Sequence, residues 1–249
     1  MRHTWRPCLF SLLTIFLFLL RSVFITGGSS GLGEGLALHY AAKGVLVAIT
    51  GRDQGRLEEV AKGIRAKGGE ARFRAVNVTD QKGLHAFIDE VDAEVPIDLL
   101  IANAGVGGMG GHDNTTLLEE FTEVTDTNLQ GVWNTVFPLV ERMCSRGYGQ
   151  VALMSSMSAY FPALGAFEYS AAKSNLSSAG RALRRYCEQF NVSVCTITPG
   201  FVRTKILPGK SKYMFEITVE EVRAVSRKEG MKGKDAMVKD VLAFTYITV

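Results

Sequence analysis

A tyrosine and a lysine lie four residues apart, at Tyr169 and Lys173, within a segment of helical pattern. Side chains with this spacing share one face of a helix, so the phenol and the ammonium group would be neighbours. A phenol titrates near about 10 in water, and a nearby cation lowers its pKa by favouring the phenolate. The pair therefore predicts a general acid/base site in which Lys173 tunes the proton affinity of Tyr169.

A glycine-rich stretch, TGGSSGLG, occupies residues 26–33 between an apolar run and a helical pattern. Glycines at such a junction allow a tight turn and leave helix N–H groups free to hold a pyrophosphate. The same letters contain the G-x-S-x-G pattern of a hydrolase, with Ser29 as nucleophile. A hydrolase needs a histidine late in the chain, whereas the last histidine is His112. We therefore interpret the stretch as a dinucleotide-binding turn.

The end of the second apolar run indicates which dinucleotide is preferred. Folds that prefer NAD usually carry Asp or Glu about 20 residues after the glycine turn, where the carboxylate holds the ribose 2′-hydroxyl. Here the chain has Gly51 and then Arg52, whose guanidinium can pair with a 2′-phosphate. Asp53 follows too late for the ribose and is better placed to cap the next helix. These residues favour NADP over NAD.

Short apolar runs alternate with longer amphipathic segments from residue 22 onward. Near-continuous apolar runs are typical of parallel strands covered on both faces, and strand–helix alternation indicates βαβ units. We therefore expect an α/β fold with a doubly wound parallel sheet (a Rossmann fold), formed by a single domain over 22–249 that follows an apolar segment over 1–21. The expected strands are 22–26, 45–50, 71–76, 97–102, 150–154 and 193–198, and the expected helices are 32–43, 54–67, 81–94, 116–146 (in two pieces) and 168–190.

In this arrangement the chain resembles the short-chain dehydrogenase/reductase family, whose landmarks it carries in the family's order. They are TGGSSGLG (26–33), NAG (103–105), the Asn of NLQG (128–131), a serine pair (155–156), YSAAK (169–173) and PGFVRT (199–204). The resemblance covers about residues 22–205. It implies an NAD(P)-dependent oxidoreductase that interconverts a secondary alcohol and a ketone.

The resemblance also implies roles for individual residues. Tyr169 would exchange a proton with the substrate oxygen, Lys173 would lower its pKa and bind the nicotinamide ribose, and Ser156 would hydrogen-bond the same oxygen. Asn128 would hold a water molecule in a proton relay, with Ser155 a structural neighbour of the site. With Arg52 included, the predicted cofactor-binding residues are Thr26, Gly27, Ser29, Ser30, Gly31, Leu32, Gly33, Arg52, Asn77, Val78, Asn103, Ala104, Gly105, Tyr169, Lys173, Pro199, Gly200, Val202 and Thr204.

Some positions depart from the family pattern. Asn77 stands where the family commonly has an Asp that meets the adenine amino group, although an amide oxygen can still accept that hydrogen bond. The segment 206–249, which would shape the substrate pocket, is short and basic. An alternative is therefore a catalytically silent, dinucleotide-binding regulatory protein of the same fold. Apolar residues between Ser156 and Tyr169 are consistent with a lipid-like ketone or alcohol as substrate, and equally with core packing or an oligomer contact.

The N-terminal residues 8–20 are apolar apart from two hydroxyl side chains. As a helix they would extend roughly 20 Å, short of the ~30 Å hydrocarbon core, and no small-residue cleavage site precedes Ser22. A short or interfacial membrane anchor, a non-cleaved targeting segment and a buried helix all remain open. We expect membrane association at the endoplasmic reticulum with the catalytic domain facing the cytosol, or else a cytoplasmic protein.

Composition limits the other functional classes. Lys and Arg total 28 against 25 Asp and Glu, a balance that argues against a dedicated nucleic-acid-binding protein. The 4 cysteines form no C-x-x-C pair, so neither a metal site nor a disulfide framework is expected. The family resemblance implies a homodimer or homotetramer, formed through the helices at about 116–146 and 168–190.

Overall fold

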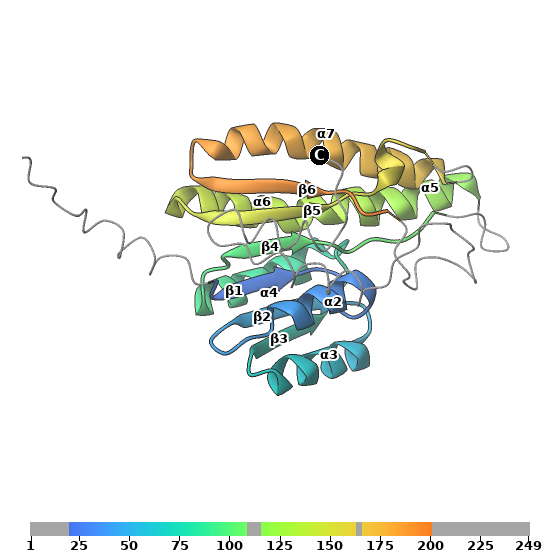
Figure 1. The fold of residues 1–249 in the computed structure, drawn as a ribbon. Coiled ribbons are helices and arrows are strands. Elements are labelled where there is room, and N and C mark those ends of the chain that lie inside the picture. The colour runs from blue at the N-terminus through green and yellow to red at the C-terminus, as the bar shows by residue number, and fades with distance from the viewer. Residues whose placement is uncertain (1–19, 109–115, 163–165, 201–249) are drawn as a thin grey trace, which may run out of the picture.

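The computed structural model describes residues 20–108, 116–162 and 166–200. They form a 6-stranded sheet in the order β3-β2-β1-β4-β5-β6, with every neighbouring pair parallel (Figure 1). The predicted doubly wound α/β sheet is confirmed, with only slight shifts at strand ends. The strands are β1 (Ser22–Ile25), β2 (Leu46–Gly51), β3 (Glu70–Ala75), β4 (Leu99–Ala102), β5 (Gly149–Met154) and β6 (Val192–Ile197).

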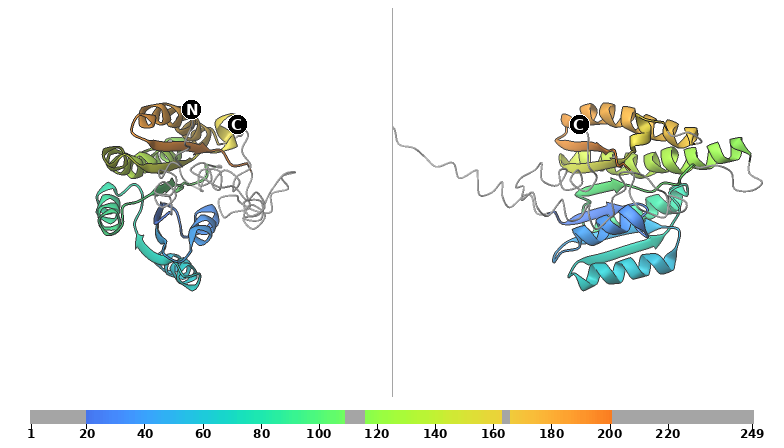
Figure 2. Two further views of the ribbon diagram at one scale, coloured as in Figure 1. Left: turned by 60° about the vertical axis from the view of Figure 1, so that its left-hand side comes forward. Right: turned by 45° about the vertical axis from the view of Figure 1, so that its right-hand side comes forward.

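Helices cover both faces of this sheet. The left view of Figure 2 shows α4 and α6 on one side and α2 on the other. Chain order reverses between β1 and β4, and in such sheets the crevice at the carboxyl ends of these strands is where ligands bind. The helical elements are α2 (Gly31–Tyr40), α3 (Gln54–Ala66), α4 (Gln81–Glu94), α5 (Leu117–Thr125), the π-helical turn η1 (Asp126–Gln130), α6 (Gly131–Arg146), the 3₁₀ turn η2 (Met157–Ala159) and α7 (Phe167–Glu188).

Strand β1 is held from both faces because its alternate side chains enter two separate cores. Phe24 packs in one core with Phe87, their ring centroids 5.5 Å apart, whereas Ile25 packs in the other with Leu36 and Leu57. All of these side chains are essentially inaccessible to solvent. Each buried side chain of this size contributes about 1.5–3 kcal/mol. The carboxyl end of β1, which leads into the glycine turn, is therefore firmly placed.

Carboxylate side chains cap the starts of α3 and α4, the first of them as the sequence predicts. Asp53 accepts a hydrogen bond from the Arg56 backbone N–H at 3.1 Å and thereby caps α3. Asp80 caps α4 in the same way, through the Gly83 N–H at 3.0 Å. Such caps satisfy N–H groups that the first helical turn leaves unpaired.

In the part of the chain that the structure describes, no helix combines the length and the apolar character needed to cross a membrane. The predicted anchor lies almost wholly within residues 1–19, which are outside the described ranges.

Candidate active site

The turn between β1 and α2 has the backbone shape that the glycine-rich stretch predicts. Gly27 and Gly31 adopt φ values of +66° and +58°, in the left-handed region that favours glycine. A Cβ added to Gly33 would overlap the carbonyl oxygen of Gly27. Helix α2 therefore approaches the turn closely only because residue 33 has no side chain, while Leu32 packs partly buried against the core.

The start of α2 is available to an anion. Ser30 is the N-cap residue, yet its side chain makes no capping hydrogen bond within the described residues. The N–H groups of the first helical turn lie at the positive end of the helix dipole, which favours a phosphate there. With the glycine backbone beside it, this helix start fits the pyrophosphate of a dinucleotide.

Hydrogen bonds tie the end of β1 to the end of β4. The Thr26 hydroxyl accepts from the backbone N–H groups of Asn103 and Ala104, each at 3.1 Å. The Asn103 side-chain amide donates to the Thr26 carbonyl oxygen at 3.0 Å. Residues 103–105 are thus fixed beside the glycine turn, at the switch between the two halves of the sheet.

The π-helical turn η1 places Asn128 next to Lys173. Asn128 is fully buried, and its side chain binds the backbone of Val106 twice: Oδ1 accepts from the N–H at 2.7 Å and Nδ2 donates to the carbonyl oxygen at 2.8 Å. A Cβ added to Gly105 would lie 3.0 Å from Asn128 Oδ1 and 3.6 Å from Lys173 Nζ. Asn128 and Lys173 therefore both lie close to the backbone of Gly105.

Lys173 is 3% exposed and its Nζ donates to the Met154 carbonyl oxygen at 2.8 Å. Burial disfavours the charged form and lowers the pKa of this lysine to about 8. The amine is consequently held at the carboxyl end of β5, in a position where its protonation changes near neutral pH.

The Tyr169 phenol differs from the expectation based on spacing. The Lys173 Nζ lies 5.5 Å from the centroid of the tyrosine ring, so the two side chains do converge. The pKa of Tyr169 is nevertheless raised, because burial outweighs the opposing effect of a hydrogen bond with Ser156. Lys173 directs its N–H toward Met154 rather than toward the phenol oxygen, and its own burial weakens its charge.

The two serines after β5 have different surroundings. Ser155 is buried, and its hydroxyl bonds the Lys173 carbonyl oxygen at 2.9 Å and the Ser177 hydroxyl at 2.8 Å, which fastens α7 to the strand. Ser156 caps η2, accepting from the Ser158 N–H at 3.2 Å. Since Ser156 also reaches Tyr169, it is the serine that is available to a ligand at this site.

Two residues predicted for the adenosine end of the cofactor are exposed. Arg52 follows β2 directly. Asn77 follows β3 and folds its amide oxygen back onto the Thr79 N–H at 3.2 Å. Val78 is buried, and its carbonyl oxygen accepts from the Asn134 side chain at 3.0 Å.

At the nicotinamide end, the Pro199 carbonyl oxygen accepts from the Met157 N–H at 2.9 Å, and Gly200 lies against the sulfur of the same methionine. Residues after β6 thus return to η2 beside Ser156. Val202 and Thr204 lie outside the described residues.

Sequence reasoning missed the backbone groups that position the site. The Val106 peptide and the Met154 carbonyl oxygen orient Asn128 and Lys173, yet backbone groups carry no residue-type signal. The sequence indicates these groups only through their positions near strand ends. Val106 directly follows the NAG motif, and Met154 directly precedes the serine pair.

Most of the chain is similar in sequence to a known protein family and to curated proteins. The family model described as short chain dehydrogenase matches residues 21–213. The protein named "Probable oxidoreductase EphD" from Mycobacterium tuberculosis is 34% identical over 188 residues, which make up 74% of this chain and 31% of that protein. The chain therefore spans about a third of the length of this relative.

Solved structures show the same similarity. A metagenomic short-chain oxidoreductase in complex with NADP matches with a TM-score of 0.67 and 28% identity, over 72% of this chain and 81% of that chain. A short chain dehydrogenase from Mycobacterium paratuberculosis bound to NAD matches with a TM-score of 0.69 and 26% identity, over 75% and 74% of the two chains.

Proposed function

Because this chain belongs to the short-chain dehydrogenase/reductase family, whose members are NAD(P)-dependent oxidoreductases, we propose that it uses NADP to interconvert a secondary alcohol and a ketone. The observation that carries this proposal is the convergence of Tyr169, Ser156 and Lys173 at the carboxyl end of β5. Residues 22–249 would form one catalytic domain, preceded by the apolar segment 1–21.

Bound NADPH would supply the hydride for reduction. As the carbonyl carbon gains that hydride, the Tyr169 hydroxyl donates its proton to the carbonyl oxygen, and the alcohol forms. Ser156 donates a hydrogen bond to the same oxygen and so orients it. In the oxidative direction the phenolate of Tyr169 removes the alcohol proton, and bound NADP⁺ would accept the hydride from the carbinol carbon.

Lys173 and Asn128 support the proton transfer. The Lys173 amine holds and re-supplies protons near Tyr169, and a pKa of about 8 suits that task near neutral pH. The Asn128 side chain fixes Val106 and hence the wall beside Lys173. A water held at this turn would complete the predicted relay to solvent.

The preference for NADP follows from the end of β2. A side chain at position 51 would meet the Ser29 hydroxyl, since a Cβ added to Gly51 lies 2.8 Å from it. The ribose-binding carboxylate of NAD-preferring folds therefore has no room without a shift of Ser29. Arg52 is exposed beside this point and supplies a cation for the 2′-phosphate.

A lipid-like substrate fits the apolar surface near Ser156. Met157, Tyr160 and Phe161 are exposed on and just after η2, Phe161 to 74%. Apolar side chains exposed beside a polar catalytic group favour a substrate with an apolar body.

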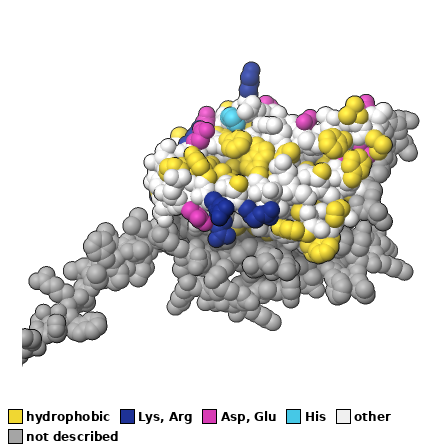
Figure 3. Space-filling view, turned by 90° about the horizontal axis from the view of Figure 1, so that it is seen from above, with side chains coloured by type: hydrophobic (Ala, Val, Ile, Leu, Met, Phe, Trp, Pro, Cys, Tyr) yellow, Lys and Arg dark blue, Asp and Glu magenta, His cyan; other side chains and the backbone are white. Residues whose placement is uncertain are grey.

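Assembly and location are further parts of the proposal. Figure 3 shows hydrophobic side chains collected on the face seen from above, over α7. Phe137 on α6 and Tyr186 on α7 are both more than half exposed, as a homo-oligomer contact through these helices requires. Membrane association, at the endoplasmic reticulum with the catalytic domain facing the cytosol, would depend on the apolar residues 8–20.

The test is NADPH oxidation by the purified chain against short-chain and long-chain ketones, followed by the loss of NADPH absorbance, with NADPH binding measured in parallel. Turnover that increases with the length of the apolar chain supports the proposal. Tight NADPH binding without turnover of any ketone would instead support the silent regulatory alternative.

A further inference from the structure

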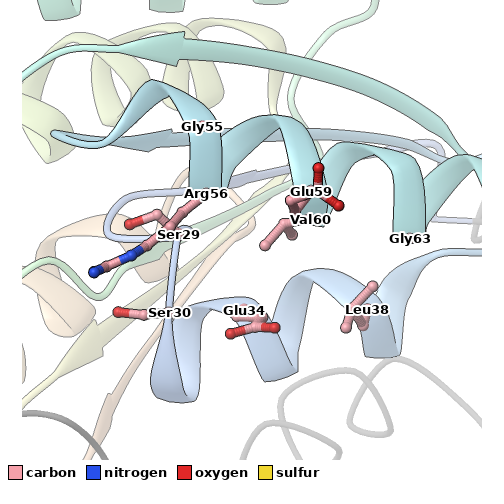
Figure 4. A pocket seen from close by; sticks show the side chains of 9 residues that line it. All are labelled: Ser29, Ser30, Glu34, Leu38, Gly55, Arg56, Glu59, Val60 and Gly63. Atoms are coloured by element: carbon pink, nitrogen blue, oxygen red, sulfur yellow. The ribbon is translucent and has the colours of Figure 1, made fainter.

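Glu168 is a buried carboxylic acid directly before the proposed proton donor, Tyr169. It is 3% exposed, and within the ranges that the structure describes its Oε1 atom has no hydrogen-bond partner. The carboxylates of Glu34 and Glu59 have different surroundings, since they line the groove of about 310 Å³ between α2 and α3 (Figure 4). The Glu59 side chain is 72% exposed and pairs with the Lys62 amine at 2.7 Å. A buried carboxylate oxygen without a partner is costly and calls for an explanation.

Gly108, in the loop after β4, makes room for this carboxylate. A Cβ added to Gly108 would overlap the Glu168 Oε1 atom and would lie 2.7 Å from the carboxyl carbon. The rings of Phe121 on α5 and Phe167 on α7 stack with their centroids 6.2 Å apart, which ties α5 to the same helical turn. Glu168 therefore lies where the first turn of α7 meets the loop after β4.

The other end of this loop borders the Lys173 amine. Gly105 lies beside Lys173 and Asn128, and the two hydrogen bonds between Asn128 and Val106 hold the loop to η1. Gly105 and Gly108 are three residues apart, so their Cα atoms are separated by at most about 11 Å. A path of a few hydrogen-bonded water molecules covers such a distance. The loop thus places a carboxylate within reach of the proposed proton relay.

From this arrangement we propose that Glu168 is a proton carrier between Lys173 and solvent. The proposal rests on the proposed oxidoreductase function and extends its relay by one group. In ketone reduction, Tyr169 gives its proton to the substrate oxygen and regains one from the Lys173 ammonium group. The resulting amine takes a proton, through water, from the protonated Glu168 carboxyl group, and the carboxylate left behind takes one from solvent. In alcohol oxidation the same protons move in the reverse order.

The position of Glu168 suits this task. The first turn of α7 places its side chain at the positive end of the helix dipole, which stabilises the carboxylate left after a proton has been given up. A carboxyl group can accept a proton on one oxygen and donate from the other, and Oε1 has no partner among the described residues that would compete for it.

The experiment follows proton release on binding of NADP⁺ and needs no substrate. Tyr169 and Lys173 should lose protons when a positive nicotinamide binds beside them, because a nearby cation favours the deprotonated forms. The full chain is mixed with NADP⁺ by stopped flow at about pH 8, close to the pKa of Lys173, in dilute buffer. A pH-indicator dye measures the rate of proton release, and protein fluorescence measures the rate of binding.

Three variants separate a proton carrier from a structural residue. Glu168→Gln keeps the size of the side chain but cannot carry a proton, whereas Glu168→Asp keeps the acid. Glu188→Gln is the matched control, because it makes the same substitution at the other end of α7, where the side chain is 64% exposed. Melting temperatures and the dissociation constant of NADP⁺, measured for each variant, check that the fold and the cofactor site are intact.

In the wild-type chain, proton release should keep pace with binding. Glu168→Gln should release the same number of protons at least about tenfold more slowly, while its dissociation constant for NADP⁺ stays within about twofold. Glu168→Asp should recover most of the rate, and Glu188→Gln should behave as the wild-type chain. An unchanged number of released protons means that the ionising pair is intact and that only its route to solvent is slower.

Proton release at the wild-type rate by Glu168→Gln overturns the role of Glu168 and leaves the proposed oxidoreductase function intact. Equal slowing in Glu168→Gln and Glu168→Asp, or loss of NADP⁺ binding in both, also overturns it, since the side chain would then support only the shape of the loop. A wild-type chain that binds no NADP⁺ overturns the proposed function itself, and the relay with it.

Discussion

At the scale of single residues, Lys173 is where stability and proposed chemistry oppose each other. Burying an amine at 3% exposure disfavours its charged form, and the hydrogen bond to Met154 compensates only in part, since the pKa still falls to about 8. A surface lysine would keep its charge but could not reach the buried phenol side of the site. Burial of Lys173 thus lowers the free energy of unfolding, and an apolar side chain at this position would avoid that cost.

This cost predicts a pH dependence of unfolding. The unfolded lysine titrates near 10.5 and the folded one near 8, so between these values the unfolded state binds more protons and the free energy of unfolding rises with pH. Below about pH 8 both states are protonated and the penalty is complete. Relative to Lys173→Met, the wild-type chain should gain roughly 3 kcal/mol from pH 8 to 10.5.

Urea unfolding of both chains at intervals across that range measures this difference, because titrating groups distant from Lys173 cancel in the comparison. Parallel stability curves for the wild-type chain and Lys173→Met would show that the amine is not held in a low-dielectric position.

Arg52 gives a second prediction at the residue scale. Arg52→Asp replaces the cation expected at the 2′-phosphate by a carboxylate that repels it and can bind the ribose hydroxyls of NAD. The ratio of kcat/KM with NADPH to that with NADH should fall by at least about tenfold, with NADH activity retained. Steady-state kinetics with both cofactors checks this, and an unchanged ratio would contradict the role of Arg52.

Spacing and motifs were sufficient to predict which side chains meet, but not their protonation. The interval between Tyr169 and Lys173 places both on one helical face, and they do converge. The raised pKa of Tyr169 depends on burial by residues distant in the sequence, and no local pattern encodes that burial. In the same way, the pairing of Asp53 with Arg56 Nε depends on side-chain directions at the start of α3.

At the scale of elements, the break between α5 and α6 is a second feature that local sequence patterns do not fully predict. The helical pattern over 116–146 predicts two pieces, and the structure contains a π-helical turn of 5 residues there, with Asn128 at its centre. Single π turns are frequently functional because they rotate the following helix and redirect side chains. Neither apolar periodicity nor helix propensity distinguishes such a turn from a continuous helix, so the contact of Asn128 with Val106 required the structure.

The close contact between α2 and the glycine turn makes a testable element-scale prediction. In Gly33→Ala the new methyl group overlaps the Gly27 carbonyl oxygen, so the helix must move away. Overpacking of this kind costs about 1–3 kcal/mol, and the displaced helix start should also bind nucleotide more weakly. Thermal unfolding and NADPH titration measure the two effects.

Gly55→Ala is the matched control for stability. A methyl group there lies in α3 with Asp53 Oδ1 as its nearest neighbour at 3.6 Å, so the melting temperature should stay the same or rise. Equal melting temperatures for the wild-type chain and Gly33→Ala would refute the proposed close approach.

At the scale of the whole molecule, the order of the strands explains why distant motifs meet. With β1 and β4 adjacent at the centre of the sheet, the glycine turn, residues 103–106 and the end of β5 all open on one edge. The alternation of strands and helices was enough to predict this edge, because parallel strands end together. The position of the segment after β6 relative to that edge could not be derived, since the pattern weakens there.

The N-terminal segment gives a prediction about the whole chain. Removing residues 1–20 deletes the apolar run and leaves β1 complete from Ser22. If that run holds the protein at a membrane, the shortened chain should move from the membrane fraction to the supernatant after cell disruption, with its melting temperature unchanged. A full-length chain recovered wholly in the supernatant would contradict the anchor.

The most direct measurement is turnover by Tyr169→Phe, which removes one hydroxyl and keeps the ring. The phenol is proposed as the proton donor to the substrate oxygen, so ketone reduction with NADPH should fall by about 10²–10⁴-fold, while the dissociation constant of NADPH stays within about twofold. Ser155, whose hydroxyl fastens α7 to β5, offers a comparison in which stability rather than turnover is lost. Reduction at the wild-type rate by Tyr169→Phe would contradict the assignment of this site as the catalytic centre.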